Sequence, residues 1–233
     1  MLRLTELSPD VQAAVAQTRE RVVALHAELP RWGLVVWTAG NVSERVPGAD
    51  LFVIKPSGVT YDQLTPEAMV VCTLDGAKID DGTAASLKPS SDTAAHAYVY
   101  RHMPEVGGVV HTHSTYATAF AARRQPIPCV LTMCGDEFGG EVPIGPLAII
   151  GDDSIGQGIV GTLRGSRSPA VLMAQHGPFT VGKDGTAAVK AAVMVEEVAR
   201  TVHAALQLGP VESLPDEMVD RLWERYQNVY GQH

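Results

Sequence analysis

The sequence lacks the features that mark membrane and secreted proteins. It has only three cysteines in 233 residues, Cys72, Cys129 and Cys134, and their spacing matches neither a zinc motif nor a disulfide framework. No stretch approaches the roughly 18 consecutive apolar residues of a membrane span, and the first residues do not show a basic region followed by an apolar one. We therefore expect a cytoplasmic protein with no membrane partner, whose cysteines are core residues.

Positive charge is also scarce. The chain has 18 lysines and arginines against 26 aspartates and glutamates, which gives a formal net charge of −8. No basic stripe is present that could neutralise a phosphodiester backbone, so nucleic acid is not an expected partner. An anionic substrate would have to be held by a local positive site.

The remaining composition is that of a globular protein. Apolar residues make up 45% and charged residues 19% of the chain, which excludes disorder, collagen and coiled coil as overall descriptions. No repeat, linker or break in composition divides the sequence, so we expect one domain over residues 1–233. Predicted helices cover residues 8–30, 90–101, 115–123, 186–208 and a segment from 213; predicted strands cover residues 34–37, 51–54, 69–74, 106–113, 127–132 and 170–174. This irregular alternation favours a single α/β or α+β layered structure, with helices covering a sheet.

Three histidines form a candidate metal site. His111 and His113 lie two apart on an apolar run, so on a strand both imidazoles would point to the same face. His176 follows a second predicted strand and is flanked by Gly177 and Pro178. Three neutral imidazoles with one open position are typical of catalytic zinc, although an isolated H-x-H is more often a pair of ordinary core or surface histidines. Asp92, in Lys88-Pro-Ser-Ser-Asp92, is a further ligand candidate, but it can equally be a carboxylate at the start of a helix.

A second group of residues is suited to binding an anion. Gly40-Asn41-Val-Ser43, Lys55-Pro-Ser57-Gly58 and Ser90-Ser91 offer backbone N–H groups, hydroxyls, an amide and an ammonium. Ser90 and Ser91 precede a predicted helix, whose N-terminus favours phosphate. None of the three segments is a Walker motif, and each by itself is more often a turn.

Taken together, these motifs resemble a known family. Gly40-Asn-Val-Ser43, Val53-Ile-Lys-Pro-Ser-Gly58, Lys88-Pro-Ser-Ser-Asp-Thr93, Gly107-Gly-Val-Val-His-Thr-His-Ser114, Gln175-His-Gly-Pro-Phe179 and Tyr230-Gly-Gln232 occur in the order found in class II, metal-dependent sugar-phosphate aldolases and epimerases. The resemblance extends from about Gly33 to the C-terminus and is strongest to the L-ribulose-5-phosphate 4-epimerases. It implies an α/β/α layered domain with a central, mostly antiparallel sheet, assembled as a C4 homotetramer with active sites shared between neighbouring subunits.

The resemblance also implies roles for individual residues. A divalent metal, usually zinc and otherwise manganese or cobalt, would be held by His111, His113 and His176 with Asp92 alongside. The phosphate of a small sugar phosphate would be bound by these residues: Asn41, Lys55, Ser57, Gly58, Ser90 and Ser91.

Two further residues correspond to the family's proton carriers, which act on the site of an adjacent subunit. They are Asp136, in Thr132-Met-Cys-Gly-Asp136, and Tyr230, for which the alternative is a loosely held aromatic near the chain end. The family epimerases usually also carry a histidine about eleven residues before the terminal tyrosine. This chain has Met218, Val219 and Asp220 there.

The resemblance leaves three functions open. Asp92 and the Gly-Pro-Phe after His176 favour the epimerase, because the fuculose-phosphate aldolases usually carry glutamate at the position of Asp92. The expected reaction interconverts L-ribulose 5-phosphate and D-xylulose 5-phosphate by retro-aldol cleavage and re-formation of C3–C4. The alternatives are an aldolase that releases an aldehyde and dihydroxyacetone phosphate, and a non-catalytic metal-binding regulatory domain.

Overall fold

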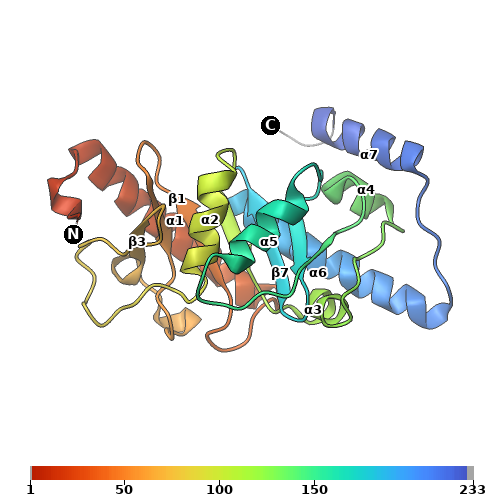
Figure 1. Cartoon of the computed structure of the whole chain (residues 1–233), viewed down its shortest axis with the longest axis horizontal. Helices are drawn as coiled ribbons and strands as arrows, with labels where there is room; N and C mark the ends of the chain where they lie inside the picture. The colour runs from red at the N-terminus through yellow and green to blue at the C-terminus, as the bar shows by residue number, and fades with distance from the viewer. Residues whose placement is uncertain (1, 230–233) are drawn as a thin grey trace.

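The computed structural model describes residues 2–229 and contains a seven-stranded sheet covered by helices within that range (Figure 1). The strand order is β3-β2-β1-β4-β7-β6-β5, with one parallel pair, β5 with β6, and antiparallel pairing elsewhere. The strands are β1 (Asn41–Arg45), β2 (Leu51–Ile54), β3 (Val70–Thr73), β4 (Gly108–His111), β5 (Ile144–Gly145), β6 (Ala170–Met173) and β7 (Gly177–Gly182). The sheet is thus central and mostly antiparallel, as expected.

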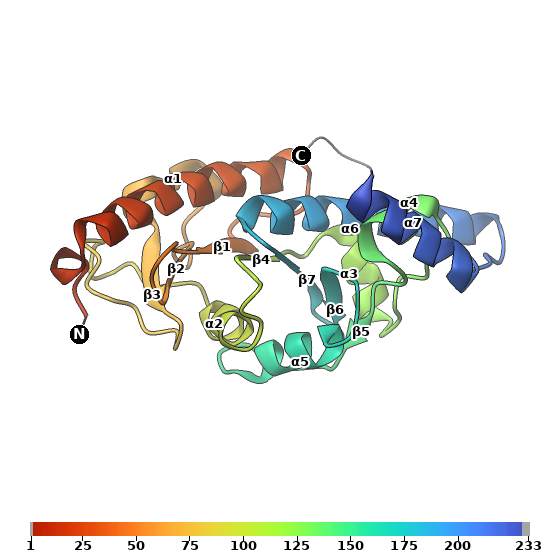
Figure 2. The same ribbon diagram turned by 90° about the horizontal axis from the view of Figure 1, so that it is seen from above.

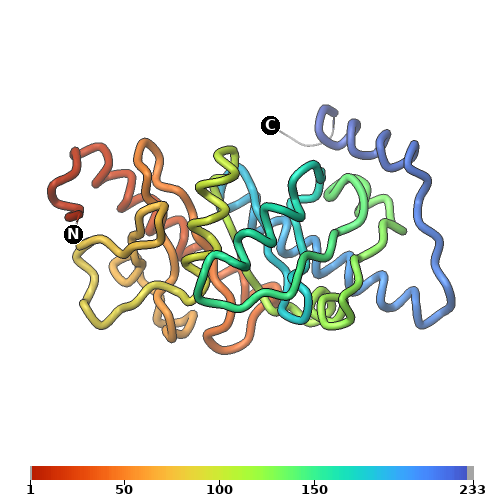
Figure 3. Tube along the Cα trace, viewed as in Figure 1, coloured from red at the N-terminus to blue at the C-terminus, as the bar shows by residue number. Residues whose placement is uncertain are grey.

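Helices cover both faces of this sheet. They are α1 (Pro9–Arg31), α2 (Thr93–His102), α3 (Thr115–Ala122), α4 (Thr132–Phe138), α5 (Ser154–Leu163), α6 (Gly185–Leu208) and α7 (Asp216–Asn228), together with the short 3₁₀ helices η1 (Leu4–Glu6), η2 (Tyr61–Gln63) and η3 (Pro66–Ala68). Figure 2 shows α1 and α6 on one face and α2 and α5 on the other, which is the expected α/β/α layering. Helix α7 follows an extended segment after α6 and returns alongside α4 (Figure 3). No helix within residues 2–229 is both long and apolar enough to cross a membrane.

The long helices begin and end at the residues that the sequence indicates. The Ser8 hydroxyl accepts a hydrogen bond from the Val11 N–H, and Pro9 occupies the first position of α1. The Asp184 carboxylate caps α6 in the same way through the Ala187 N–H, and Gly209 follows its last residue with a positive φ of 144°. The three cysteines are buried free thiols, as expected for core residues.

Two predicted strands are wrong. Residues 34–37 form no strand; Val36 and Trp37 are exposed there, and Trp37 has a positive φ of 59°. Residues 127–132 contain only an isolated bridge between Ile127 and Val142, and Thr132 already begins α4. In both segments an apolar run predicts a strand, but the backbone forms loops that do not pair with a neighbouring strand along their length.

The structure also contains elements that the sequence did not predict, among them strands β1 and β7, helix α5, and the short elements α4 and β5. Strands β1 and β7 begin with Asn41 and with Gly177-Pro178, residue types that are depleted in strands. Helix α5 contains three glycines, which weaken its helical pattern. Its close packing against α2 explains one of them, because a Cβ on Gly156 would lie 2.4 Å from the Tyr98 Cβ.

A buried histidine ties α1 to the central strand β1. The His26 side chain, 1% exposed, donates from Nδ1 to the Val22 carbonyl at 2.7 Å, and its Nε2 accepts from the Val42 N–H at 2.9 Å. Burial lowers the pKa of His26 from 6.5 to about 3. The unfolded chain therefore binds one more proton than the folded chain between these two pKa values.

This imidazole makes stability depend on pH. As the pH falls below about 6.5, the free energy of unfolding should decrease by about 1.4 kcal/mol per pH unit because of His26, until its folded-state pKa is reached. His26→Gln removes the titrating group, so its unfolding free energy should fall less steeply with acid than that of the unmodified protein, by that slope. Urea unfolding at several pH values between about 5 and 8 measures the difference. Equal slopes in the two proteins would show that His26 does not titrate in this way.

Candidate active site

Three central strands bring the site together at one edge of the sheet. In the ladder, Asn41 pairs with His111 and His111 pairs with Phe179, so the start of β1, the end of β4 and the start of β7 are neighbours. His113 lies two residues beyond the end of β4, and His176 lies in the short loop that joins β6 to β7. Antiparallel pairing thus places three histidines from two distant segments at one point.

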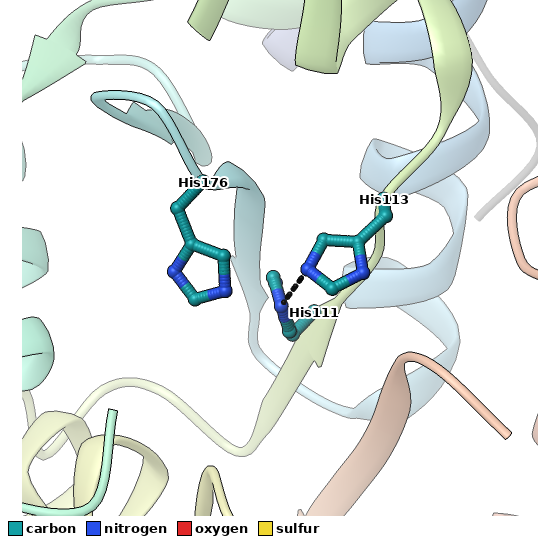
Figure 4. A group of neighbouring side chains, drawn as sticks. All are labelled: His111, His113 and His176. Carbon is teal, nitrogen blue, oxygen red and sulfur yellow. Dashed lines mark hydrogen bonds between the residues drawn. The ribbon is translucent and has the colours of Figure 1, made fainter. Parts of the chain in front are cut away.

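The three imidazoles face one another (Figure 4). Each offers one nitrogen, and the three nitrogens lie within 4.8 Å of one another. His111 Nε2 and His113 Nε2 are 3.1 Å apart. The structure therefore brings the three predicted histidines together, although His113 lies beyond the end of the strand that carries His111.

His111 is held most firmly of the three. Its Nδ1 lies 3.0 Å from the Pro178 carbonyl oxygen and donates to it, which leaves the Nε2 lone pair directed at the cluster. Its ring stacks on Phe179 with centroids 4.0 Å apart. Burial lowers the pKa of His111 to about 3, and burial also lowers the pKa values of His113 and His176. All three imidazoles are thus neutral near pH 7, the form that binds metal.

Asp92 stands beside the histidines as a buried carboxylate. It is the N-cap residue of α2 but makes no side-chain capping bond, so a role as an ordinary helix cap does not describe it. Its Oδ2 accepts from the Asn41 amide at 2.7 Å, whereas its Oδ1 is buried without a hydrogen-bond partner among residues 2–229. The group of ligand atoms that lie within 4.8 Å of one another contains the three histidines and not Asp92, which lines the same cleft. An unpartnered carboxylate oxygen in a cleft with three inward-facing imidazoles fits a divalent metal ion.

The anion-binding candidates line the same cleft as the histidines. This cleft, of about 200 Å³, is lined by all six predicted phosphate residues and by all four predicted metal residues: Asn41, Lys55, Ser57, Gly58, Ser90, Ser91, Asp92, His111, His113 and His176. The Asn41 Nδ2 donates to the Ser90 Oγ at 3.0 Å as well as to Asp92, so one amide links the two halves of the site.

Lys55 supplies positive charge within this cleft. It is 2% exposed, and burial lowers its pKa. Its Nζ donates to the Thr38 carbonyl at 3.2 Å and the Pro56 carbonyl at 3.4 Å, and within the described part of the chain no carboxylate forms an ion pair with it. A buried ammonium without a counter-charge is stabilised by an anionic ligand.

The cleft has three further lining residues that the sequence did not identify: Thr38, Ala39 and Ile150. Gly40, which belongs to the predicted anion-binding segment, lines it as well. Gly40 has a φ of +79°, and a Cβ there would lie 2.9 Å from the His111 carbonyl oxygen, so only glycine permits this approach. The glycine before Asn41 was a usable signal, whereas nothing in the pattern around Ile150 indicated a place in the site.

Of the two predicted proton carriers, only Asp136 lies among the described residues, and it does not line this cleft. Asp136 lies on α4 and pairs with Arg225 of α7 at 3.7 Å. Tyr230 lies outside the described residues. The region that lacks the family's histidine has structural contacts instead, because Val219 is buried in the core and Asp220 pairs with Arg167.

A family model described as the Class II Aldolase and Adducin N-terminal domain matches residues 20–203. The chain belongs to the class II aldolase family. It is 37% identical over 227 residues to the L-ribulose-5-phosphate 4-epimerase UlaF of Salmonella paratyphi C, with 92% of this chain and 98% of that protein covered. Class II aldolases bind a divalent metal, and the histidine cluster of this member provides the site for it.

Solved structures support the same assignment of the fold. An L-fuculose 1-phosphate aldolase superimposes with a TM-score of 0.83 at 25% identity, covering 95% of this chain and 98% of that one. The L-fuculose-1-phosphate aldolase from Thermus thermophilus gives a TM-score of 0.69 at 25% identity, covering 87% of this chain and all of its own. Both neighbours are named L-fuculose-1-phosphate aldolases, and each superposition covers most of this chain.

Proposed function

We propose that this class II aldolase family member is an epimerase that interconverts L-ribulose 5-phosphate and D-xylulose 5-phosphate. The observation that carries the proposal is the single cleft in which three neutral imidazoles, a buried aspartate and a phosphate-type anion site meet. The 37% identity to a named epimerase over 92% of the chain supports this reaction over others of the family. Asp92, where the fuculose-phosphate aldolases usually have glutamate, supports it as well.

The substrate dictates the type of chemistry. The C4 hydrogen of the pentulose is β to the ketone and is not acidic, so inversion at C4 requires the C3–C4 bond to open. The C4 hydroxyl loses its proton and becomes an aldehyde, while the bonding electrons move toward C3 and the C2 carbonyl to give an enediolate. After the aldehyde turns over, the bond forms again on its other face and the oxygen regains a proton.

The residues of the cleft divide this work. His111, His113 and His176, with Asp92 beside them, would hold a divalent ion, for which we propose zinc, with manganese or cobalt as alternatives. That ion supplies Lewis acidity at the ketone and its neighbouring hydroxyl. Lys55 and the hydroxyl and N–H donors around Ser57, Gly58, Ser90 and Ser91 bind the phosphate, which retains the aldehyde fragment while the bond is open.

Proton transfer to and from the C4 oxygen is assigned to Asp136 and Tyr230, one on each face. Asp136 does not line the cleft of its own chain, which supports its acting on the site of a neighbouring subunit. We therefore propose a C4 homotetramer with shared active sites. The three buried free thiols support a reducing compartment such as the cytoplasm.

A product assay separates this proposal from its two alternatives. Zinc-loaded protein is incubated with L-ribulose 5-phosphate, and D-xylulose 5-phosphate and free glycolaldehyde phosphate are quantified together. The epimerase gives the epimer with little free fragment. Accumulating fragments, or cleavage of L-fuculose 1-phosphate, would indicate the aldolase that the solved neighbours resemble, and binding without turnover would indicate a regulatory domain.

Ser90 provides a test of the phosphate site. Its Oγ accepts from the Asn41 Nδ2 at 3.0 Å and lies at the N-terminal end of α2. Ser90→Ala should raise KM about 5- to 30-fold with a smaller change in kcat, because a hydrogen bond to a charged group contributes about 1–2 kcal/mol. Ser166→Ala, an exposed serine outside the cleft, is the control. If Ser90→Ala leaves KM unchanged and inorganic phosphate fails to compete with substrate, the phosphate binds elsewhere.

A further inference from the structure

Two residues near His176 hold backbone conformations that are rare for residues with side chains. Gln175 and Arg124 each have a φ of 56°, and within residues 2–229 Trp37 is the one other non-glycine residue with a positive φ. Neither is β-branched or glycine, and neither is an asparagine that would tolerate this region. Such strained positions persist where surrounding contacts hold them, and they cluster at functional sites.

The strain at Gln175 lies in the loop that carries His176. Met173 pairs with Gly177 across the β6–β7 ladder, so residues 174–176 form the connection. The His176 N–H donates to the Met173 carbonyl at 3.0 Å and closes a four-residue turn. Gln175 occupies the third position of this turn, where a positive φ normally requires glycine or asparagine.

Contacts from α3 hold Gln175 in this conformation. Its N–H donates to the Ala121 carbonyl at 2.8 Å, and its Oε1 accepts from the Arg124 Nε at 3.2 Å and from the Arg124 NH2 nitrogen at 2.6 Å. The Arg124 N–H in turn donates to the same Ala121 carbonyl at 2.9 Å. The two left-handed residues are thus fixed to each other and to one carbonyl at the end of α3.

The His176 ring has less support from hydrogen bonds than the His111 ring. The His111 ring is fixed by the Pro178 carbonyl and by Phe179, whereas no hydrogen bond to the His176 ring is found in the part of the chain that the structure describes. The ring contacts of His176 are with Phe179, at 5.9 Å between centroids, and with the other two histidines, so the backbone of its loop determines where the imidazole can lie. That loop is held by α3, the helix that begins two residues after His113.

We propose that Arg124 and Gln175 form a clamp that positions His176 for metal binding. Both are exposed and neither lines the cleft, so they are positioning residues that act through the loop. The start of α3 is fixed as well, because the Glu196 carboxylate accepts from the Tyr116 and Ala117 N–H groups, each at 2.9 Å. Helix α3 thereby sets the distance between His113, which precedes it, and His176, whose loop it contacts.

The proposed clamp rests on the metal site of the proposed function. It is tested by measuring the zinc affinity of the apoprotein in competition with a chromophoric chelator. Arg124→Ala and Gln175→Ala should each weaken zinc binding about tenfold, as removal of an outer partner of a metal ligand does. The double variant should bind no more weakly than the worse single one, because the two side chains act as a unit. Arg123→Ala is the matched control, since among the described residues the side chain of this neighbouring exposed arginine bonds only Gln125.

Two further measurements separate positioning from stability and from function. Gln175→Gly relieves the backbone strain but removes the amide, so it should fold normally, by circular dichroism, and still bind zinc more weakly. At saturating zinc the clamp variants should lower kcat with little change in KM, because the phosphate residues are untouched.

Zinc affinity of folded Arg124→Ala equal to that of the unmodified protein would overturn the clamp. If the unmodified protein binds zinc but does not epimerise, the proposed function fails and the clamp is still decided by affinity.

Discussion

His113→Ala should leave a folded protein that has lost its metal and several orders of magnitude of turnover. The variant keeps His111 and His176, but two imidazoles bind zinc far more weakly than three with an adjacent carboxylate. Turnover falls with the metal because no second group of metal ligands is found among residues 2–229 to hold a Lewis acid for the ketone. Metal content by atomic spectroscopy after dialysis, together with kcat/KM, measures both losses.

The control for this change is His203→Ala. His203 is an exposed histidine on α6, outside the cleft, so its removal should alter neither metal content nor turnover. Adding excess zinc should restore little activity to His113→Ala. An active His113→Ala protein free of metal would contradict the assignment of the whole cluster.

Asp136→Asn should reduce turnover by about 10²–10⁴-fold while metal and substrate still bind, because it removes a general acid-base group and leaves the cleft intact. The amide keeps the shape of the side chain on α4, so assembly should be unchanged. A rate equal to that of the unmodified enzyme would exclude Asp136 as a proton carrier.

Mixing two inactive variants tests whether the site is shared between subunits. A chain with His113→Ala lacks metal but keeps Asp136. A chain with Asp136→Asn binds metal but lacks the aspartate. After co-expression at equal levels, about a quarter of the sites of a cyclic tetramer combine an intact histidine cluster with an intact neighbouring aspartate. Recovery near that fraction supports the shared site, and no recovery would show that both residues serve the same chain.

The sequence predicted the long helices better than the sheet. Amphipathic spacing with Ser8 and Pro9 at one end identified α1, and Gly209 marked the end of α6. The central strands β1 and β7 were missed because they are buried on both faces and lie against the site. Their first residues, Asn41 and Gly177, are there for the chemistry and for close backbone approach: a Cβ on Gly177 would lie 2.7 Å from the Thr112 carbonyl. Within β7 only Phe179, Thr180 and Val181 have high strand propensity, and glycines flank the strand at both ends.

The sequence predicted the residues that line the candidate site but not the residues that hold them in position. Histidine spacing and the family's motifs named ten residues that share one cleft. Ile150 and the clamp of Arg124 and Gln175 could not be predicted, because their roles depend on which loops the fold brings together. A glutamine in a left-handed turn looks like any other polar residue in a sequence.

Epimerisation of L-ribulose 5-phosphate labelled with deuterium at C4 is the most direct test of the account. NMR should show D-xylulose 5-phosphate with the deuterium still on C4, formed by zinc-loaded protein and not after the metal is removed. Retention follows because cleavage of C3–C4 never breaks the C–H bond. Loss of the label to solvent, full activity without metal, or no epimer at all would contradict it.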